Sequence, residues 1–142
     1  MILYLDTSSL LKYYVDEDHS GDVRGWIDGA DLLATSRVTL VEAAAALSRR
    51  YLGGGLTREQ CRSAFADLEA DWPLYIAVEL YEERAAEVAW RHLLRGFDSI
   101  QLAAALTVRQ GAGPERLVFS SFDVELNRAA RAEGLTVLEP LD

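Results

Sequence analysis

The chain has 142 residues, of which half are hydrophobic and about a quarter are charged. That length suits one domain around one hydrophobic core, and the composition excludes disordered and fibrous proteins. The formal net charge of −9 argues against non-specific binding to nucleic acid or to anionic lipid. A polyanionic substrate would therefore have to be held by a local basic patch and by bound cations.

The single cysteine, Cys61, cannot form an internal disulfide, so nothing indicates an oxidising compartment. The N-terminus has no basic segment, no long apolar segment and no small-residue cleavage site, and we therefore expect no secretion signal. No apolar run approaches the ~20 residues that a membrane-spanning helix needs. We expect a cytoplasmic protein that does not contact a membrane.

Short apolar runs alternate with helical patterns along the whole chain. We expect five strands, at residues 2–5, 32–35, 74–78, 117–119 and 135–138. Helices are expected between them, over residues 8–14, 21–28, 39–52, 57–71, 81–94, 98–108 and 123–133. This alternation predicts parallel strands joined by right-handed crossovers. The expected fold is one Rossmann-like domain over residues 1–142, a three-layer α/β/α sandwich with a central parallel five-stranded sheet.

One pair of helices has clear boundaries in the sequence. The helix over 39–52 is almost entirely apolar until Arg49-Arg50, and Gly53-Gly54-Gly55 breaks it. Thr57 is expected to cap the next helix, which Trp72-Pro73 ends. The two helices should form a hairpin.

Four acidic residues lie where one element gives way to the next: Asp6, Glu42, Asp98 and Asp123. A carboxylate at the C-terminal end of a buried parallel strand points into the crevice where open α/β sheets bind ligands. Carboxylates gathered within a few ångströms cannot all stay ionised unless a cation compensates them. All-oxygen ligands favour Mg²⁺, with Mn²⁺ as an alternative, and His19 and His92 are interpreted as surface residues.

Each carboxylate also has a structural interpretation. Asp98 and Asp123 could be helix N-caps, and Thr39-Leu40-Val41-Glu42 has the form of a capping box. Asp6 is harder to explain in this way, because an ionised carboxylate directly behind four apolar residues needs a partner or a metal. The joint pattern of the four favours a shared site.

Four segments of this chain, taken in order, resemble the successive motifs of PIN-domain ribonucleases. They are Tyr4-Leu5-Asp6-Thr7-Ser8-Ser9-Leu10-Leu11-Lys12, Thr39-Leu40-Val41-Glu42, Gly96-Phe97-Asp98-Ser99-Ile100-Gln101-Leu102-Ala103-Ala104-Ala105 and Val118-Phe119-Ser120-Ser121-Phe122-Asp123. At this small size the chain is most similar to VapC-type toxins of bacterial toxin–antitoxin pairs. The resemblance implies a PIN-like fold and a metal-dependent endoribonuclease.

The resemblance also assigns individual residues. It makes Asp6, Glu42, Asp98 and Asp123 catalytic metal ligands and gives Ser121 a catalytic role in holding a ligand or a metal-bound water. Thr7 is a weaker candidate for supporting Asp6. The implied partners are a VapB-type antitoxin, an RNA substrate and a second copy of the chain.

Other enzyme classes fit the sequence less well. No Ser and His form a recognisable triad and no Gly-x-Ser-x-Gly elbow is present, so metal-activated water is the preferred nucleophile. Asp6-Thr7-Ser8 lacks the second aspartate of haloacid-dehalogenase phosphatases, and Lys12, the only lysine, lies too early for a response-regulator receiver. The alternative from another class is a non-catalytic PIN-fold module that binds metal and RNA.

Two further surfaces are expected from the sequence. Apolar positions of the hairpin would form an antitoxin groove, and they are Leu47, Tyr51, Leu56 and Phe65. Basic residues near the acidic segments would hold RNA phosphates, and they are Lys12, Arg37, Arg49, Arg50, Arg91 and Arg95. Single-stranded or looped RNA is the expected substrate, because the major groove of an A-form duplex cannot be read by side chains.

Overall fold

A computed structural model describes residues 1–141 of the chain, and Asp142 lies outside the described residues. The strands are β1 (Ile2–Leu5), β2 (Leu32–Ser36), β3 (Tyr75–Val78), β4 (Leu117–Ser120) and β5 (Thr136–Leu138). The helices are α1 (Thr7–Tyr14), α2 (Ser20–Asp28), α3 (Val38–Leu52), α4 (Arg58–Asp71), α5 (Glu82–His92), α6 (Gly96–Ala112) and α7 (Val124–Ala132), and a short 3₁₀ turn spans Trp72–Leu74. All the expected elements are present.

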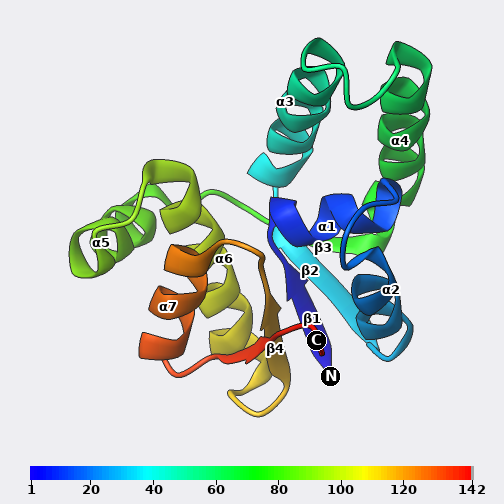
Figure 1. Cartoon of the computed structure of the whole chain (residues 1–142). Helices are drawn as coiled ribbons and strands as arrows, with labels where there is room; N and C mark the ends of the chain where they lie inside the picture. The colour runs from blue at the N-terminus through cyan, green and yellow to red at the C-terminus, as the bar shows by residue number, and fades with distance from the viewer. Residues whose placement is uncertain (142) are drawn as a thin grey trace.

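The strands form one five-stranded sheet in the order β3-β2-β1-β4-β5, and every pairing is parallel. Helices cover both faces, so the predicted three-layer α/β/α sandwich is confirmed (Figure 1). The chain order reverses between β1 and β4, which lie side by side. In sheets of this type the ligand crevice lies at that reversal, outside the carboxyl ends of the strands.

Two hydrophobic cores lie on opposite faces of the sheet. Tyr4 and Phe119 project from β1 and β4 toward α5, α6 and α7, and their stacked rings have centroids 5.5 Å apart. Leu3 and Leu5 project from the other face of β1 toward α1, α2, α3 and α4. All four residues of β1 are buried, as expected of a strand covered on both faces.

The α3–α4 hairpin is present and projects beyond the sheet (Figure 1). Gly54 in its turn has φ of +79°, a conformation that residues with a Cβ rarely adopt. Thr57 caps α4 through a capping box with Gln60, and Trp72-Pro73 ends the helix in the 3₁₀ turn. Local sequence signals therefore determine this element from end to end.

Two details differ from expectation, and the conformation of His19 adds a third observation. Helix α6 begins at Gly96 and continues through Gly111 to Ala112, where a loop was expected. His92 is buried rather than on the surface, because the end of α5 packs against α7 and brings its Nε2 to 3.6 Å from the Glu133 carboxylate. His19 is exposed as expected, but it adopts a left-handed backbone conformation and its ring stacks on Phe122.

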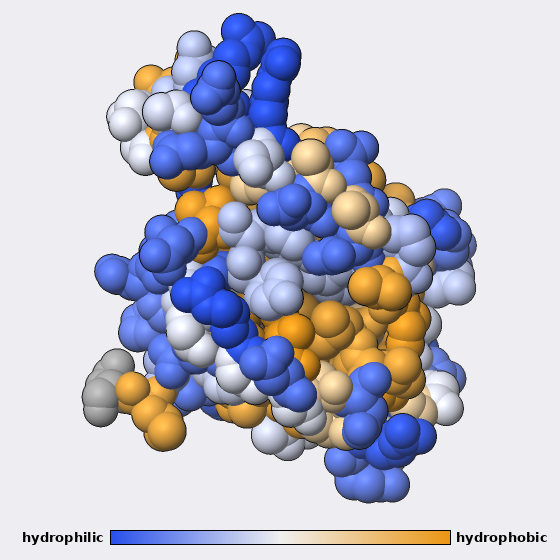
Figure 2. Space-filling model, turned by 90° about the vertical axis from the view of Figure 1, so that its right-hand side faces the viewer, coloured by the Kyte–Doolittle hydropathy of each residue, from blue (hydrophilic) through white to orange (hydrophobic). Residues whose placement is uncertain are grey.

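The surface is unevenly hydrophobic. Figure 2 views the side that carries α2 and α4, and shows hydrophobic surface gathered on its lower part while the projecting end at the top is mostly hydrophilic. Among residues 1–141, no helix is both long enough and apolar enough to cross a membrane.

Candidate functional site

Asp6 lies at the carboxyl end of β1 and is the N-cap of α1. Its Oδ1 accepts hydrogen bonds from the Ser9 backbone N–H at 3.1 Å and from Ser8 Oγ at 2.7 Å. Its Oδ2 accepts one from Ser121 Oγ at 2.9 Å. Burial nevertheless raises the pKa of Asp6 from 3.8 to about 6, since these three hydrogen bonds compensate only part of the desolvation.

The turn after β4 supplies the next group of the site. Ser121 Oγ accepts the backbone N–H of Asp123 at 3.0 Å while it donates to Asp6. The Ser121 hydroxyl, which was expected to hold a ligand or a metal-bound water, instead holds the Asp6 carboxylate. Asp123 caps α7 by accepting the Leu126 N–H at 2.9 Å, so the N-cap interpretation is correct for its Oδ1. Its Oδ2 faces Arg95.

Glu42 lies in the first part of α3, and the capping-box interpretation of Thr39 and Glu42 is wrong. Helix α3 has no side-chain cap, and Thr39 Oγ1 instead accepts a hydrogen bond from Gln101 Nε2 at 2.9 Å. Glu42 Oε1 accepts hydrogen bonds from Thr7 Oγ1 at 2.8 Å and Gln101 Nε2 at 2.7 Å. Thr7 therefore supports Glu42, and the prediction that it supports Asp6 is wrong.

Asp98 lies in the first turn of α6 rather than at its N-cap, which is Arg95. Burial is the largest cause of a raised pKa for Asp98, and the Asp123 carboxylate adds to it. Arg95 Nη2 lies 3.2 Å from Asp98 Oδ2 and 3.3 Å from Asp123 Oδ2. A guanidinium thus bridges two of the four carboxylates.

All four carboxylates line one hollow of about 400 Å³ at the carboxyl edge of the sheet, beside the reversal between β1 and β4. The hollow is also lined by Thr7, Ser8, Phe97, Gln101, Arg49 and Arg50, among others. Burial is the main cause of the raised pKa of Asp6 and of Asp98, and neighbouring carboxylates raise both further. The structure thus brings the four acids to one hollow, and their joint action as a metal site stays a prediction.

The chemistry of the donor set fits a hard divalent cation, because every candidate ligand is a carboxylate oxygen. As the side chains stand, no three His, Cys, Asp or Glu residues within 1–141 are close enough together to ligate one ion. Arg95 holds the Asp98 and Asp123 oxygens, and hydroxyls hold those of Asp6. A bound ion would have to displace Arg95 and draw the carboxylates inward.

The expected basic residues divide into two groups. Arg49 and Arg50 line the hollow and Arg95 bridges the acids, whereas Arg37 pairs with Glu79 and Arg91 with Glu133. These last two therefore lie in other ion pairs and do not line the hollow.

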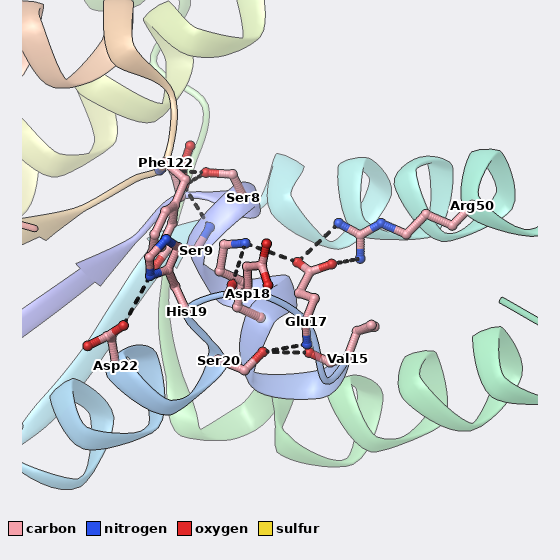
Figure 3. Close-up of polar contacts among 12 residues, drawn as sticks. Ser8, Ser9, Val15, Glu17, Asp18, His19, Ser20, Asp22, Arg50 and Phe122 are labelled. Carbon is pink, nitrogen blue, oxygen red and sulfur yellow. Dashed lines mark hydrogen bonds and ion pairs between the residues drawn. The ribbon is translucent and has the colours of Figure 1, made fainter. Parts of the chain in front are cut away.

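Glu17, in the loop between α1 and α2, neutralises two of the nearby cations. Figure 3 shows its carboxylate pointing toward Arg50, with Nη1 and Nη2 each 3.3 Å away. Lys12 Nζ lies 3.3 Å from the same carboxylate and 4.6 Å from the centroid of the Phe122 ring. Arg49 lines the hollow and forms no salt bridge within the described residues, whereas Arg50 is paired with Glu17. The Arg49 charge is therefore available to a phosphate.

The PIN domain family model matches residues 3–132, which is nearly the whole chain. The chain belongs to the PIN-domain family. It is 33% identical over 139 residues to Ribonuclease VapC45 and to Ribonuclease VapC49 of Mycobacterium tuberculosis, covering 96% of this chain and 94% of each relative. The resemblance inferred from the four motifs is confirmed.

Solved PIN-domain structures share the fold. FitAcB from Neisseria gonorrhoeae aligns with a TM-score of 0.65 at 19% identity, over 98% of this chain and 97% of that one. Mycobacterium tuberculosis VapC20, described as a toxin that cleaves the sarcin–ricin loop, aligns with a TM-score of 0.65 at 17% identity, over 97% of this chain and 99% of that one. FitAB bound to an IR36 DNA fragment aligns with a TM-score of 0.64 at 18% identity, over 97% and 94%.

From the sequence, no specific role was expected of Ser8 or Gln101 in this PIN-domain site, and Arg95 was predicted to bind RNA phosphate, whereas it bridges Asp98 and Asp123. Ser8 Oγ donates to Asp6 and accepts the Phe122 N–H, which links the β1 and β4 turns. Gln101 had a visible signal, since it is the one polar residue in the apolar run from Ile100 to Val108 other than Thr107. A buried polar side chain in such a run must find hydrogen-bond partners.

Proposed function

We propose that this PIN-domain protein is a Mg²⁺- or Mn²⁺-dependent endoribonuclease of the VapC type and the toxin of a toxin–antitoxin pair in the cytoplasm. The observation that carries the proposal is the convergence of four carboxylates, from four different elements, on one hollow at the sheet reversal. The similarity to VapC45 and VapC49, both named ribonucleases, supports RNA as the substrate.

Each residue has a distinct role in the proposed reaction. Asp6, Glu42 and Asp98 would hold one ion, and Asp98 with Asp123 a second where it forms. Bound Mg²⁺ or Mn²⁺ supplies a water of lowered pKa and neutralises charge on the phosphodiester. Ser121 and Ser8 fix the Asp6 carboxylate through hydrogen bonds to opposite oxygens.

The proposed substrate is single-stranded or looped RNA. Arg49 lies at the hollow without an ion pair, and it can grip a phosphate with two N–H groups. Exposed bases of loops can be read where duplex major grooves cannot. The description of VapC20 as cleaving the sarcin–ricin loop supports a looped target.

RNA cleavage by the purified protein tests the activity. Wild type should cut single-stranded and hairpin RNA with Mg²⁺ or Mn²⁺ and lose the activity in EDTA. Asp98→Asn should be inactive, while Asp67→Asn, an exposed acid on α4, should cut normally. RNA that is bound but never cut, with either metal, would establish the alternative of a non-catalytic metal- and RNA-binding module.

Mapping of new RNA 5′ ends identifies the target in cells. Induction of wild type should create ends that induction of Asp98→Asn does not. Identical end profiles from the two would contradict a ribonuclease role.

The proposed antitoxin is of VapB type and docks on the α3–α4 hairpin. A hollow of about 520 Å³ lies between the two helices, and Tyr51 and Phe65 line it as expected. Leu47 also borders it but is buried in the core, with 3% exposed, so its main role is core packing. Leu56 does not line it and packs against the core instead. The net charge of −9 favours a partner segment rich in Arg or Lys.

Co-purification with the product of a neighbouring gene tests this partner. Tyr51→Asp should abolish the complex, because it replaces an aromatic ring with a charge in a mostly apolar hollow. Tyr81→Asp, at an exposed tyrosine outside that hollow, is the matched control and should leave the complex intact. Equal retention of the partner by both variants would contradict docking on the hairpin.

A homodimer through the helices that flank the sheet is also proposed. Trp90 and Leu93, at the end of α5, are 83% and 85% exposed, which is unusual for large apolar side chains so close together. Light scattering should give twice the chain mass for wild type and a monomer for Trp90→Glu. A monomeric wild type would overturn the dimer.

A further inference from the structure

We infer that Gln101 is a positioning residue that holds the Glu42 carboxylate in a single orientation, with Oε1 fixed in the protein and Oε2 presented to the hollow. Gln101 is 2% exposed and lies one turn after Asp98 on α6. The inference rests on the proposed function, because it concerns how one candidate ligand of the proposed ion is oriented.

The contacts of the Gln101 amide determine which way it points. Its Oε1 accepts a hydrogen bond from the buried hydroxyl of Tyr4 at 2.7 Å. Its Nε2 lies 2.7 Å from Glu42 Oε1, 2.9 Å from Thr39 Oγ1 and 3.2 Å from Thr7 Oγ1, so its two N–H protons are shared among three acceptors, of which Glu42 is the nearest. An ionised carboxylate can only accept, and therefore the amide nitrogen must be the atom that faces Glu42.

The far end of the network is anchored in the sheet. Tyr4 projects from β1 and stacks on Phe119, so its hydroxyl has little freedom. Thr39 Oγ1 lies 2.8 Å from Thr35 Oγ1, which reaches the Leu5 carbonyl at 2.7 Å. Gln101 is thus held directly by Tyr4 of β1 and, through Thr39 of α3, by Thr35 of β2.

The consequence falls on one oxygen of Glu42. Thr7 Oγ1 and Gln101 Nε2 both donate to Oε1, and within the described residues no hydrogen bond is made to Oε2. A long, flexible glutamate side chain is thereby reduced to one conformer that leaves one oxygen for a ligand. Groups that orient a metal ligand in this way typically contribute 10–100-fold to metal affinity.

Mn²⁺ binding without RNA tests the inference, measured by calorimetry and by the electron paramagnetic resonance of free Mn²⁺. Gln101→Met keeps the side-chain length but removes both amide functions, and should weaken Mn²⁺ binding roughly tenfold or more. Gln101→Met alone would leave the Tyr4 hydroxyl without its acceptor. The double variant Tyr4→Phe with Gln101→Met removes that hydroxyl as well, so the protein should fold and show the same loss of Mn²⁺ affinity. Thr107→Val, which removes a hydroxyl from the same helix away from the hollow, should bind as wild type does.

A second measurement separates positioning from a general structural role. In a Glu42→Gln background, Gln101→Met should change Mn²⁺ affinity less than about twofold, because its effect passes through the Glu42 carboxylate. An unchanged affinity of the Gln101 variants, or the same loss in both backgrounds, would overturn the inference while the proposed function stands. A wild-type protein that binds neither Mn²⁺ nor Mg²⁺ would overturn both.

Discussion

Asp6 is a buried acid, and its ionisation makes the stability of the metal-free protein depend on pH. Its folded pKa of about 6 lies above the ordinary 3.8, so the unfolded chain loses this proton first. Folding stability should therefore fall as pH rises from about 4 to about 6, with the full loss above that range. At 1.36 kcal/mol per pKa unit the loss is about 3 kcal/mol.

Asp6→Asn should remove this loss. At pH 7.5 without divalent cations the variant should be up to about 3 kcal/mol more stable than wild type, and the gain should vanish at pH 4. Urea unfolding across this pH range measures it, with Asp67→Asn as the exposed control. A constant difference at all pH values would show that hydrogen bonding, and not charge, distinguishes the variant.

Arg95 is the residue that an arriving cation would have to displace. Its side chain is 81% exposed and bridges Asp98 and Asp123, so each ion pair is screened by solvent and is worth less than about 1 kcal/mol. Removing both pairs in Arg95→Gln should strengthen Mg²⁺ or Mn²⁺ binding roughly two- to tenfold.

Calorimetric titration at low salt measures this change. Arg128→Gln is the matched control, because Arg128 forms an ion pair on α7 with Glu125 and does not line the hollow. Weaker binding in Arg95→Gln would mean that the guanidinium orders the carboxylates for the ion instead of competing with it.

At the scale of elements, the α3–α4 hairpin depends on one backbone conformation in its turn. Gly54 has φ of +79°, whereas its neighbour Gly55 does not have a positive φ. A Cβ added at Gly55 would lie 3.7 Å from the Arg50 carbonyl oxygen, which is ordinary van der Waals contact. Gly54→Ala should cost about 1–2 kcal/mol because an L-residue is strained in that region. Gly55→Ala should change stability by less than about 0.5 kcal/mol.

Chemical denaturation of the two variants provides the comparison. Both substitutions add the same methyl group in the same turn, so any difference between them reports backbone strain. Equal losses would assign the effect to crowding of the turn.

At the scale of the whole molecule, acidity limits how strongly RNA phosphates can be held. The net charge is −9, and Arg50 near the hollow is already paired with Glu17. If the protein neutralises two or three RNA phosphates, a plot of the logarithm of the RNA-binding constant against the logarithm of the salt concentration should have a slope no steeper than about −2. Binding of single-stranded RNA to Asp98→Asn from 50 to 300 mM salt, roughly the range used for such titrations, measures the slope. A slope of about −5 or steeper would reveal a phosphate-binding surface beyond Arg49 and Arg50.

The sequence predicts the strands and the gathering of the acids well because both follow from local patterns. Each strand is a short apolar run, and parallel strands place their carboxyl ends at one edge. Thr39 shows the limit of local patterns. Its spacing to Glu42 is that of a capping box, but the contact with Gln101, 62 residues away, takes its place. Tertiary partners of this kind cannot be read from spacing alone.

His92 and Arg95 show the same limit. His92 is a polar residue near a helix end, which predicts exposure, and its burial comes from α7 packing alongside. Arg95 precedes a helix and contacts Asp123, 28 residues later. In both cases the deciding neighbour lies on another element, and only the packing of α5, α6 and α7 brings it close.

The hydrogen bond between Ser121 and Asp6 joins residues 115 positions apart and has a consequence for synthesis of the chain. A nascent chain emerges with β1 first, and β1 must wait for β4, near the other end, before the two turns can meet. Until then Asp6 has neither Ser121 nor Asp123 beside it, and the hollow does not exist. Pairing at such a distance is slow relative to local structure. On a ribosome that makes this protein the hollow therefore cannot assemble until β4 and the turn after it have emerged, which gives a partner already in the cell time to meet the chain before the four carboxylates come together.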